Sequence, residues 1–485
     1  MSGFSAKLTC GGPCPASPLL RSGYPYSFTF VQENVPGVRS SPAISIASRN
    51  AGRIIVSVTP TEQQFVTAQA SRQDALTLLF FLLAAFAFLL RSTISPQLMN
   101  MVMSYSTEGG SFPEKLHIGT YAIFLLLVVI ATTRPIRLEG DEVRLFKATL
   151  LYSLLLLWLV PYLFVIGRAG SAGFIIDSYL VSCAAAMIML ALGDHVRRAL
   201  GNVIVGMIVL SAIIGTIEAV TQHRFLPYPL VELDFRPIGL SAHPLALGAL
   251  CTTAIGFVAL TRWRIWVCAL CIFILFIGTA ASGARTALLL ACGEILFLLV
   301  FLPWPDLSPR HQRQAKLLVL MLTLAGGAIL IAILFSAGLL NRFSNTLFDQ
   351  NYDARVKIYD VFKFVEWRDI LLGMNPNELL KIVNEKLNLP FIESTPVVLT
   401  LLFGLPIALL FAFAFFRFLF KLLRNTPRAA HIAAAASILA ALSNNALSSK
   451  APDIMLLVIL LLAYRKPDGR QTGTPLQGQP ASTAT

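Results

Sequence analysis

The sequence predicts an all-α polytopic membrane protein with about twelve transmembrane helices. Of its 485 residues, 56% are hydrophobic and only 13% are charged, and the mean hydropathy is +0.72. Soluble domains carry about twice that share of charge. The apolar residues also fall into separate blocks of about 17 to 23, the length that an α-helix needs to cross a hydrocarbon core. These blocks must be helices, because lipid offers the backbone no hydrogen-bond partners.

Twelve such blocks follow one another along the chain, and the last is the shortest. In order, they predict spans at about 74–90, 116–132, 148–166, 173–192, 201–220, 243–261, 265–281, 286–303, 317–338, 395–416, 430–446 and 453–464.

The basic residues predict the orientation of these spans. Lys and Arg are concentrated in alternate loops, which we assign to the cytoplasm by the positive-inside rule. These loops hold Arg134, Arg137, Arg144, Lys147, Arg197, Arg198, Arg262, Arg264, Arg310, Arg313, Lys316, Arg417, Lys421, Arg424 and Arg428. The short outside loops hold Arg91, Lys115, Arg168, Arg224, Arg236, Arg285 and Lys450. Both termini are then cytoplasmic.

The chain divides into three parts on this reading. Residues 1–72 are rich in Ser, Pro, Gly and Arg and contain no apolar run long enough for a signal peptide, so we expect a cytoplasmic, mostly disordered extension. Residues 73–465 form the transmembrane domain. Residues 466–485 are expected to be a disordered cytoplasmic tail.

One outside segment, residues 339–394, is far longer than the rest and lies between the ninth and tenth predicted spans. Long loops obey the charge rule poorly, so its basic content does not affect the orientation. Residues 353–367 and 377–387 have apolar residues at helical spacing, which predicts two short amphipathic helices on the membrane surface.

Composition also excludes several classes of function. The net charge of +13 sits in short loops between apolar blocks, so it reports topology and does not predict a nucleic-acid partner. Cys268 and Cys271 lie inside a predicted span with no His nearby, so we interpret them as packing residues. The sequence lacks a phosphate-binding Gly-rich loop, a zinc-protease motif and the acidic pair of metal-dependent glycosyltransferases. We therefore expect no metal and no cofactor.

Arg236 and Arg285 are the most informative residues, because each lies at the outer mouth of a predicted span. A cation at such a junction normally faces a wet cavity or an anionic partner. A guanidinium group matches phosphate bidentately and keeps its charge, and several together neutralise a diphosphate without a metal ion. The alternative for Arg285 is a snorkelling anchor at a helix end.

Three further residues have more than one reading. Arg355 starts an amphipathic pattern in the large loop and is either solvated or a phosphate ligand. His243, flanked by Pro244, is either a helix-entry residue or a proton acceptor near an outer cavity. Glu393 stands directly before an apolar run, where a carboxylate is costly unless it is paired, used in chemistry or capping a helix.

Few acidic residues lie inside the central predicted spans or near their ends. They are Asp177, Glu218 and Glu294. Proton-coupled transporters rely on such groups. Their scarcity weakens a transporter reading and does not remove it.

At these positions the chain resembles the O-antigen ligase and Wzy polymerase superfamily of bacterial envelope glycosyltransferases. Four patterns carry the resemblance, in the order and places that the family has them, over about residues 74–465. They are Arg236-Pro-Ile-Gly-Leu-Ser-Ala-His243-Pro, Ala281-Ser-Gly-Ala-Arg285-Thr, Ala354-Arg355-Val-Lys-Ile-Tyr with Leu371-Leu-Gly373, and Glu393-Ser with Leu402-Phe-Gly404-Leu.

The resemblance implies transfer of glycan from an undecaprenyl-diphosphate donor at the periplasmic face of the bacterial inner membrane. By this likeness Arg236 and Arg285 hold the donor diphosphate, and Arg355 matches a further basic position of the large periplasmic loop. Family ligases end this loop with a His that activates the acceptor hydroxyl. Here Glu393 takes that place, which favours a polymerase.

We therefore interpret the chain as a metal-independent polymerase that joins lipid-linked repeat units of an exopolysaccharide, a capsule or an O-antigen. Glu393 or His243 would act as the base. Its partners would be the lipid-linked glycan donor and acceptor, membrane lipid, a flippase and a chain-length regulator. The alternatives are a ligase that transfers glycan to lipid A-core and, in another class, a transporter or flippase of lipid-linked oligosaccharide.

Overall fold

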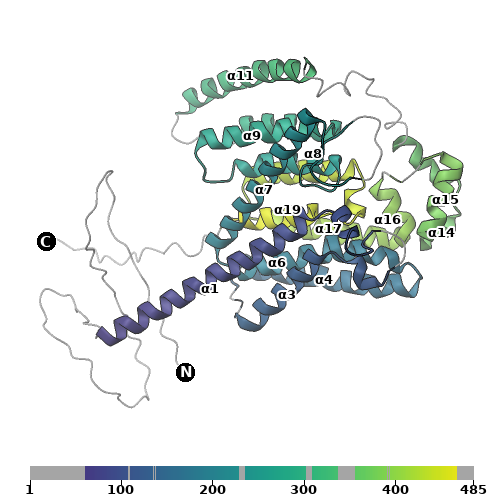
Figure 1. Cartoon of the computed structure of the whole chain (residues 1–485), viewed down its shortest axis with the longest axis horizontal. Helices are drawn as coiled ribbons and strands as arrows, with labels where there is room; N and C mark the ends of the chain where they lie inside the picture. The colour runs from purple at the N-terminus through teal and green to yellow at the C-terminus, as the bar shows by residue number, and fades with distance from the viewer. Residues whose placement is uncertain are drawn as a thin grey trace, which may run out of the picture. The chain divides into compact units, whose positions relative to one another are not determined.

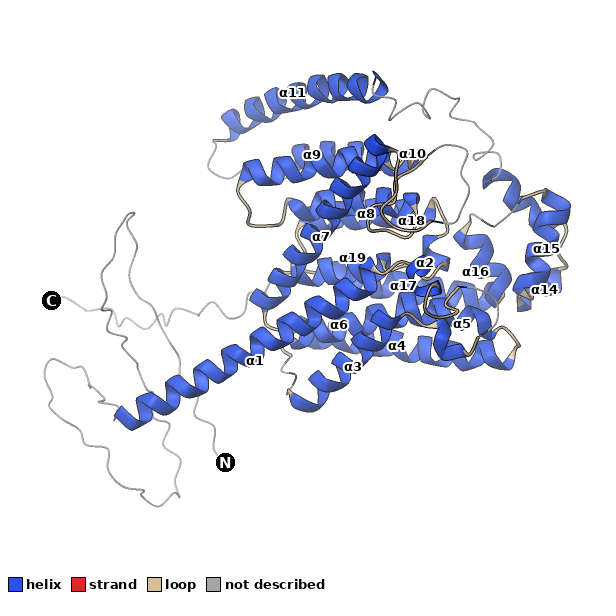
Figure 2. Ribbon diagram, in the orientation of Figure 1, coloured by secondary structure: helices blue, strands red, loops and turns tan. Residues whose placement is uncertain are grey.

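The computed structural model is helical, and the part of the chain that it describes contains no strand (Figure 2). It describes residues 60–106, 110–134, 136, 138–228, 235–301, 308–336, 355–389, 392 and 394–466, with side chains from residue 73 on except at 309, 330, 331, 333 and 334. Contacts divide the chain into two units, Met1–Arg72 and Gln73–Thr485. Most of the two tails predicted to be disordered falls outside the described residues, although helix α1 begins at Pro60.

Every predicted span coincides with a helix or with a run of consecutive helices (Figure 1). In order these are α1 (Pro60–Thr93), α3 (Ile118–Thr133), α4 (Asp141–Val165), the run of η2 (Ala169–Ser171), α5 (Ala172–Phe174), η3 (Ile175–Leu180) and α6 (Val181–Ala191), α7 (Asp194–Thr221), α8 (Pro244–Val258), α9 (Ile265–Ala281), α10 (Arg285–Phe301), α11 (Pro309–Ser336), α16 (Thr395–Phe403) with α17 (Leu405–Leu423), α18 (Arg428–Leu442) and α19 (Asp453–Ala463).

Five of the described segments are long and apolar enough to cross a membrane. They are Gln73–Thr93, Asp141–Val165, Ala169–Ala191, Asp194–Thr221 and Leu405–Leu423. Five more apolar helices are shorter, at 10 to 17 residues: α3, α8, α9, α18 and α19. By length and composition, then, the chain is a helical membrane protein.

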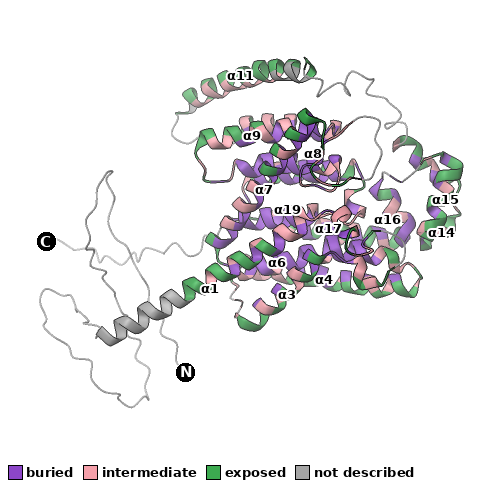
Figure 3. Ribbon diagram, viewed as in Figure 1, coloured by how far each residue is buried: buried purple, intermediate pink, exposed green. Residues whose placement is uncertain are grey.

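Burial separates the inner helices from the outer ones (Figure 3). Every residue of α19 from Ile454 to Ala463 is buried, and α19 packs against α6, α7 and α8. Helix α1 instead exposes a stripe of Leu78, Leu82 and Phe86. Exposed large apolar side chains on an apolar helix are what a lipid-facing surface presents, so α1 lies at the edge of the helix bundle and α19 at its centre.

Small residues allow the central helices to approach closely. A Cβ added at Gly278 of α9 would meet Ala212 of α7, and one added at Gly256 of α8 would meet Ala433 of α18. Helices within a membrane associate largely through such close packing, because lipid supplies no hydrophobic driving force between them. These glycines therefore set the spacing of the bundle around α8.

The predicted span at 395–416 has the wrong limits. Gly404 adopts φ +85°, a conformation that side chains disfavour, and it separates α16 from α17. The apolar helix that follows runs on to Leu423 and so includes Arg417 and Lys421, which the sequence had placed in a cytoplasmic loop.

The described part of the large loop forms η4 (Ile358–Lys363), α14 (Trp367–Leu372) and α15 (Pro376–Leu387). The prediction of two surface helices is therefore only partly right. Leu379, Val383 and Leu387 lie one turn apart on α15 and pack with η4 and α16 in a separate small core. The apolar face of α15 thus covers protein, while Trp367 of α14 remains 74% exposed.

Polar contacts group the connecting segments into two sets. The loops predicted to lie outside the cell contact one another through Arg91 and Asp177, Arg91 and Lys450, Gln97 and Ala242, Arg236 and Ser282, and Thr395 and Asn444. The cytoplasmic set is joined by Arg197 and Glu142, Arg424 and Asp141, and Tyr464 and Asn202. The structure thus joins several segments that the charge pattern places on the same side of the membrane.

Candidate functional site

The loop between α7 and α8 is organised by one buried carboxylate. Glu218, in the last turn of α7, is fully buried and accepts backbone hydrogen bonds from Phe225 at 2.9 Å and from Ile238 and Gly239 at 2.8 Å each. Three N–H donors offset much of the cost of burying the charge. Glu218 therefore closes the loop back onto α7, and this role differs from that of a transporter carboxylate.

Gly239 is needed at the point where the loop returns to the bundle. Its φ is +55°, and a Cβ there would collide with the main-chain oxygen of Ser211. The next residue, Leu240, donates its N–H to Ser211 Oγ at 3.0 Å. On the other side, Gln97 of α2 (Pro96–Asn100) donates to the carbonyl oxygen of Ala242 at 3.2 Å. The segment before α8 is thus held by α2 and α7 together.

Arg236 connects this loop to the turn between α9 and α10. Its Nε donates to the carbonyl oxygen of Ser282 at 3.0 Å. Ser282 is fully buried, and its Oγ donates to Thr279 and accepts from the N–H of Ala284, so the turn has little freedom. Arg285 is the first residue of α10, three positions after the carbonyl that Arg236 contacts. Arg236 and Arg285 are therefore carried by two segments that are bonded to each other.

A third arginine supports Arg236 from within the same loop. Arg224 Nε donates to the main-chain oxygen of Arg236 at 3.0 Å. Its guanidinium group lies 4.4 Å from the ring centroid of Tyr228 and 4.9 Å from that of Phe235. Cation–π contacts of this kind hold a guanidinium group in place while it keeps its charge. Arg224 therefore adds positive charge at a fixed position behind Arg236.

His243 is the N-cap of α8, and its Nδ1 accepts the N–H of Leu245 at 3.2 Å. Burial and the nearby cations Arg236 and Arg224 lower the pKa of His243 to about 4. The imidazole is thus neutral at pH 7. Because Nδ1 accepts a hydrogen bond, the single ring proton lies on Nε2. At neutral pH the half-buried ring can therefore donate a hydrogen bond from Nε2.

Taken together, this end of the bundle presents guanidinium groups and one imidazole N–H on segments that are tied to one another. Guanidinium groups bind phosphate oxygens through paired, charge-assisted hydrogen bonds. Groups already fixed by the fold also pay little ordering cost when a ligand arrives. The arrangement is suited to a doubly charged phosphate ester.

The other two predicted site residues are not placed in this group. Arg355 is half-buried directly before η4, beside the small core that η4, α15 and α16 share. Glu393 lies outside the described residues. Its neighbour Ser394 is the N-cap residue of α16, and the Ser394 hydroxyl donates to Tyr359 Oη at 3.3 Å.

A second polar cluster was not predicted. Asp177, in the π-helical turn η3, is fully buried and accepts from Tyr105 Oη and Thr120 Oγ1, at 2.8 Å each, and from the N–H of His117. Arg91 donates to the main-chain oxygen of Asp177 at 2.9 Å. This cluster joins α1, α3 and η3.

His117 in this cluster precedes a helix as His243 does, but the hydrogen bonds of its ring differ. It is also an N-cap residue, and its Nδ1 accepts from Gly119 while Nε2 lies 2.9 Å from the carbonyl oxygen of Ile94. Both ring nitrogens are thus used within the protein, and the side chain is fully buried. The Asp177 cluster is therefore a structural clamp.

Sequence reasoning noted some members of both clusters without seeing how they are bonded. Asp177 and Glu218 stood out as rare acids at span ends, and Arg91 and Arg224 were assigned to outside loops. Because Arg91 and Asp177 lie near the same end of the predicted spans, topology could have suggested that they meet. No local sequence spacing could have done so, since Arg91 and Asp177 are 86 residues apart.

Comparisons of the chain with models of known families, with curated proteins and with solved structures gave no match. The resemblance to the O-antigen ligase and Wzy polymerase superfamily therefore depends on the four sequence patterns and on the arrangement just described.

Proposed function

We propose that this chain polymerises undecaprenyl-diphosphate-linked oligosaccharide repeat units, as a metal-independent glycosyltransferase of the inner membrane. The observation that carries the proposal is the bond between Arg236 and Ser282, which fixes one arginine of the family pattern to the turn that bears the other, Arg285. Neutral His243 lies beside Arg236. Such a group suits the diphosphate of a lipid-linked donor.

The proposal includes the topology of twelve spans with cytoplasmic termini. It is supported by the match of each predicted span to a helix or run of helices, and by the separation of the loops into two hydrogen-bonded sets. The end that carries Arg236 would face the periplasm. The large loop between spans nine and ten would cover that end.

In the proposed reaction, an acceptor hydroxyl attacks the anomeric carbon of the donor sugar. The bond from that carbon to the diphosphate oxygen breaks, and its electron pair leaves with undecaprenyl diphosphate. Direct displacement inverts the anomeric configuration. Negative charge grows on the leaving group, so Arg236 and Arg285 would contribute most in the transition state.

The geometry favours a donor role for His243 over the role of base. Its Nδ1 is engaged by Leu245 and its Nε2 carries the proton, so at neutral pH the ring has no nitrogen available to accept a proton from the acceptor. We therefore assign the Nε2 proton to a hydrogen bond with a phosphate oxygen, and we assign the base to Glu393, which would take the proton of the acceptor hydroxyl.

The test is reconstitution of the full chain in liposomes with lipid-diphosphate-linked repeat units, followed by separation of the glycans by size. A ladder of longer glycans with released lipid diphosphate, reduced at least about a hundredfold in rate by Arg285→Ala, would support the polymerase. Arg264→Ala, which removes an exposed cation next to α9, should leave the ladder intact.

Two outcomes would favour a different function. Transfer of glycan only when lipid A-core is added would identify a ligase. Glu393→Gln separates the enzyme from a flippase, because a flippase moves lipid without a base and should tolerate the change. No ladder with either acceptor, together with movement of labelled lipid across the bilayer, would overturn the proposal in favour of transport.

A further inference from the structure

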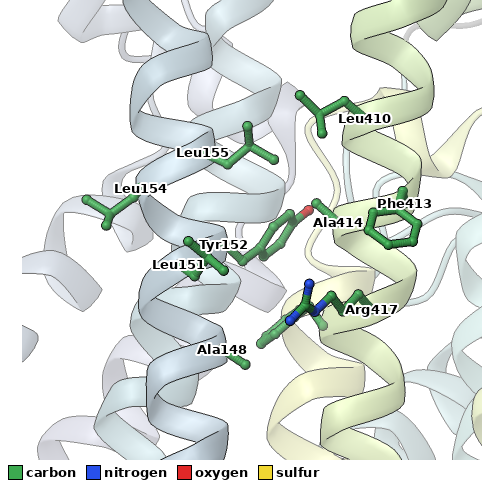
Figure 4. A pocket seen from close by; sticks show the side chains of 10 residues that line it. Ala148, Leu151, Tyr152, Leu154, Leu155, Leu410, Phe413, Ala414 and Arg417 are labelled. Carbon is green, nitrogen blue, oxygen red and sulfur yellow. The ribbon is translucent and has the colours of Figure 1, made fainter.

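A groove of about 380 Å³ lies between α4 and α17, on the outer surface of the bundle (Figure 4). Its walls are apolar and come from both helices. They include Leu151, Leu154, Leu155, Leu410 and Phe413. Several of these side chains are more than half exposed in the structure, so the groove opens toward the surrounding membrane.

The floor of the groove carries a polar group. Tyr152 is only 4% exposed, and its ring stacks on Phe418 with centroids 5.1 Å apart, which holds the side chain in place. Its hydroxyl points toward α17 (Figure 4) and has no hydrogen-bond partner among the described residues. A buried hydroxyl without an acceptor is costly, about 1 to 3 kcal/mol, and few native proteins retain one without a reason.

One end of the groove carries a cation. Arg417 lines it from α17 and is exposed, and it takes part in no ion pair within the described residues. It lies toward the end of α17 at which Arg424 pairs with Asp141 of α4, 3.7 Å apart. Leu410 lies seven residues earlier, about 10 Å along the helix axis. A charged end, a hydroxyl and an apolar channel thus follow one another along the groove.

This order is the order of chemical groups in a membrane phospholipid, which has a charged phosphate, then ester oxygens, then an acyl chain. We propose that the groove binds one anionic phospholipid from the leaflet on the Arg424 side. Its phosphate pairs with Arg417, an ester oxygen accepts the proton of Tyr152, and an acyl chain lies along the leucines between α4 and α17. The exposed side chain of Arg417 changes its rotamer so that the ester can reach Tyr152.

The proposal is independent of the polymerase reaction, because none of the residues that line the groove belongs to the segments that carry Arg236 and Arg285. On this proposal, a lipid molecule fills the groove between α4 and α17 in the folded protein. Anionic lipid should then stabilise the folded chain by binding it and not the unfolded chain.

The experiment measures thermal unfolding of the full chain in detergent, with dioleoylphosphatidylglycerol, dioleoylphosphatidylcholine or inorganic phosphate added at equal concentration. We expect the anionic lipid to raise the unfolding midpoint by about 3 °C or more beyond the zwitterionic lipid, and inorganic phosphate to have no effect. Arg417→Gln should remove most of this difference. Arg417→Lys, which keeps the charge, should retain most of it.

Two more variants complete the test. Lys421→Gln removes a cation one turn further along α17 that does not line the groove, so it should keep the full difference. Tyr152→Phe should unfold no earlier than the wild type without lipid and should lose part of the gain with either lipid. Equal stabilisation by both lipids, or a full anionic-lipid effect in Arg417→Gln, would overturn the proposal.

Discussion

Arg236 Nε and the carbonyl oxygen of Ser282 lie 3.0 Å apart, which joins a loop to a turn that is 46 residues away in the sequence. The bond orients the guanidinium plane at the same time as it fixes the loop. Positioning of this kind before the substrate binds is what transition-state stabilisation requires.

Arg236→Lys tests whether that orientation matters beyond the charge. Lysine keeps the positive charge, but its single ammonium cannot hold Ser282 and present a planar pair of donors to a phosphate. We expect the initial rate of glycan extension in liposomes to fall about 10- to 100-fold. Arg264→Lys, an exposed site next to α9, is the matched control. An unchanged rate in Arg236→Lys would show that charge alone is enough.

His243 can be tested with two replacements, because it both caps α8 and carries the imidazole. Asparagine can accept the N–H of Leu245 as His243 does, so His243→Asn should keep the unfolding midpoint within about 1 °C while the extension rate falls about tenfold. His243→Ala should lower both, since it also loses the cap. Equal rates in wild type and His243→Asn would leave His243 with a capping role only.

Glu218→Gln addresses the organisation of the loop. The amide has one acceptor oxygen in place of two, and its NH₂ group would face either the backbone N–H of Phe225 or those of Ile238 and Gly239. We expect a loss of roughly 2 to 4 kcal/mol in the free energy of unfolding, measured by denaturant titration in detergent. Glu385→Gln, at an exposed site on α15, is the control. A midpoint equal to wild type would mean that the loop is held by its other contacts.

Much of the fold follows from the apolar blocks and from the charges of the loops. The blocks predicted where the helices lie, because an apolar segment of that length has few alternatives in a membrane. The limits failed at Gly404, where the break comes from a backbone conformation and hydropathy continues through it without change. For α15 the predicted limits hold, but the predicted surroundings do not, because apolar spacing does not say whether lipid or protein will cover a helix face.

The candidate site was predictable only in part. The family patterns singled out Arg236, Arg285 and His243 as residues of one site, and the structure brings the segments that carry them together. The partners that fix them could not be predicted, because Glu218 and Ser282 act through backbone groups that have no sequence signature. The Asp177 cluster was missed because its contacts join segments that are far apart in the sequence.

The pH dependence of stability should carry the signature of His117. Burial and the nearby Arg91 lower the pKa of His117 from 6.5 to about 3. The unfolded chain therefore binds a proton below about pH 6.5 that the folded chain does not bind until about pH 3. The contribution of His117 to the free energy of unfolding is full above pH 6.5 and falls by up to about 1.4 kcal/mol per pH unit below it.

The measurement is the unfolding midpoint from pH 8 to pH 4 for the wild type and for His117→Asn. The variant can keep the bond from Gly119 but loses the one to Ile94, so it should be less stable at pH 8. Its midpoint should nevertheless fall less steeply below pH 6.5. Parallel curves for the two proteins would contradict the assignment.

Glu294 offers the sharpest distinction between an enzyme and a proton-coupled transporter. It is 2% exposed in α10, and neither carboxyl oxygen accepts a hydrogen bond of normal geometry from a described residue. A Cβ at Gly256 of α8 would collide with it, so the carboxyl group fills a tight helix contact. A transporter would need this group to bind and release protons. The proposed reaction does not use it.

Glu294→Gln keeps the shape of the side chain and removes the ionisable group. We expect the glycan ladder to persist, with an unfolding midpoint equal to or above that of the wild type. Loss of function in a folded Glu294→Gln protein, with proton-dependent lipid movement in the wild type, would favour transport, because the proposed reaction has no role for this buried acid.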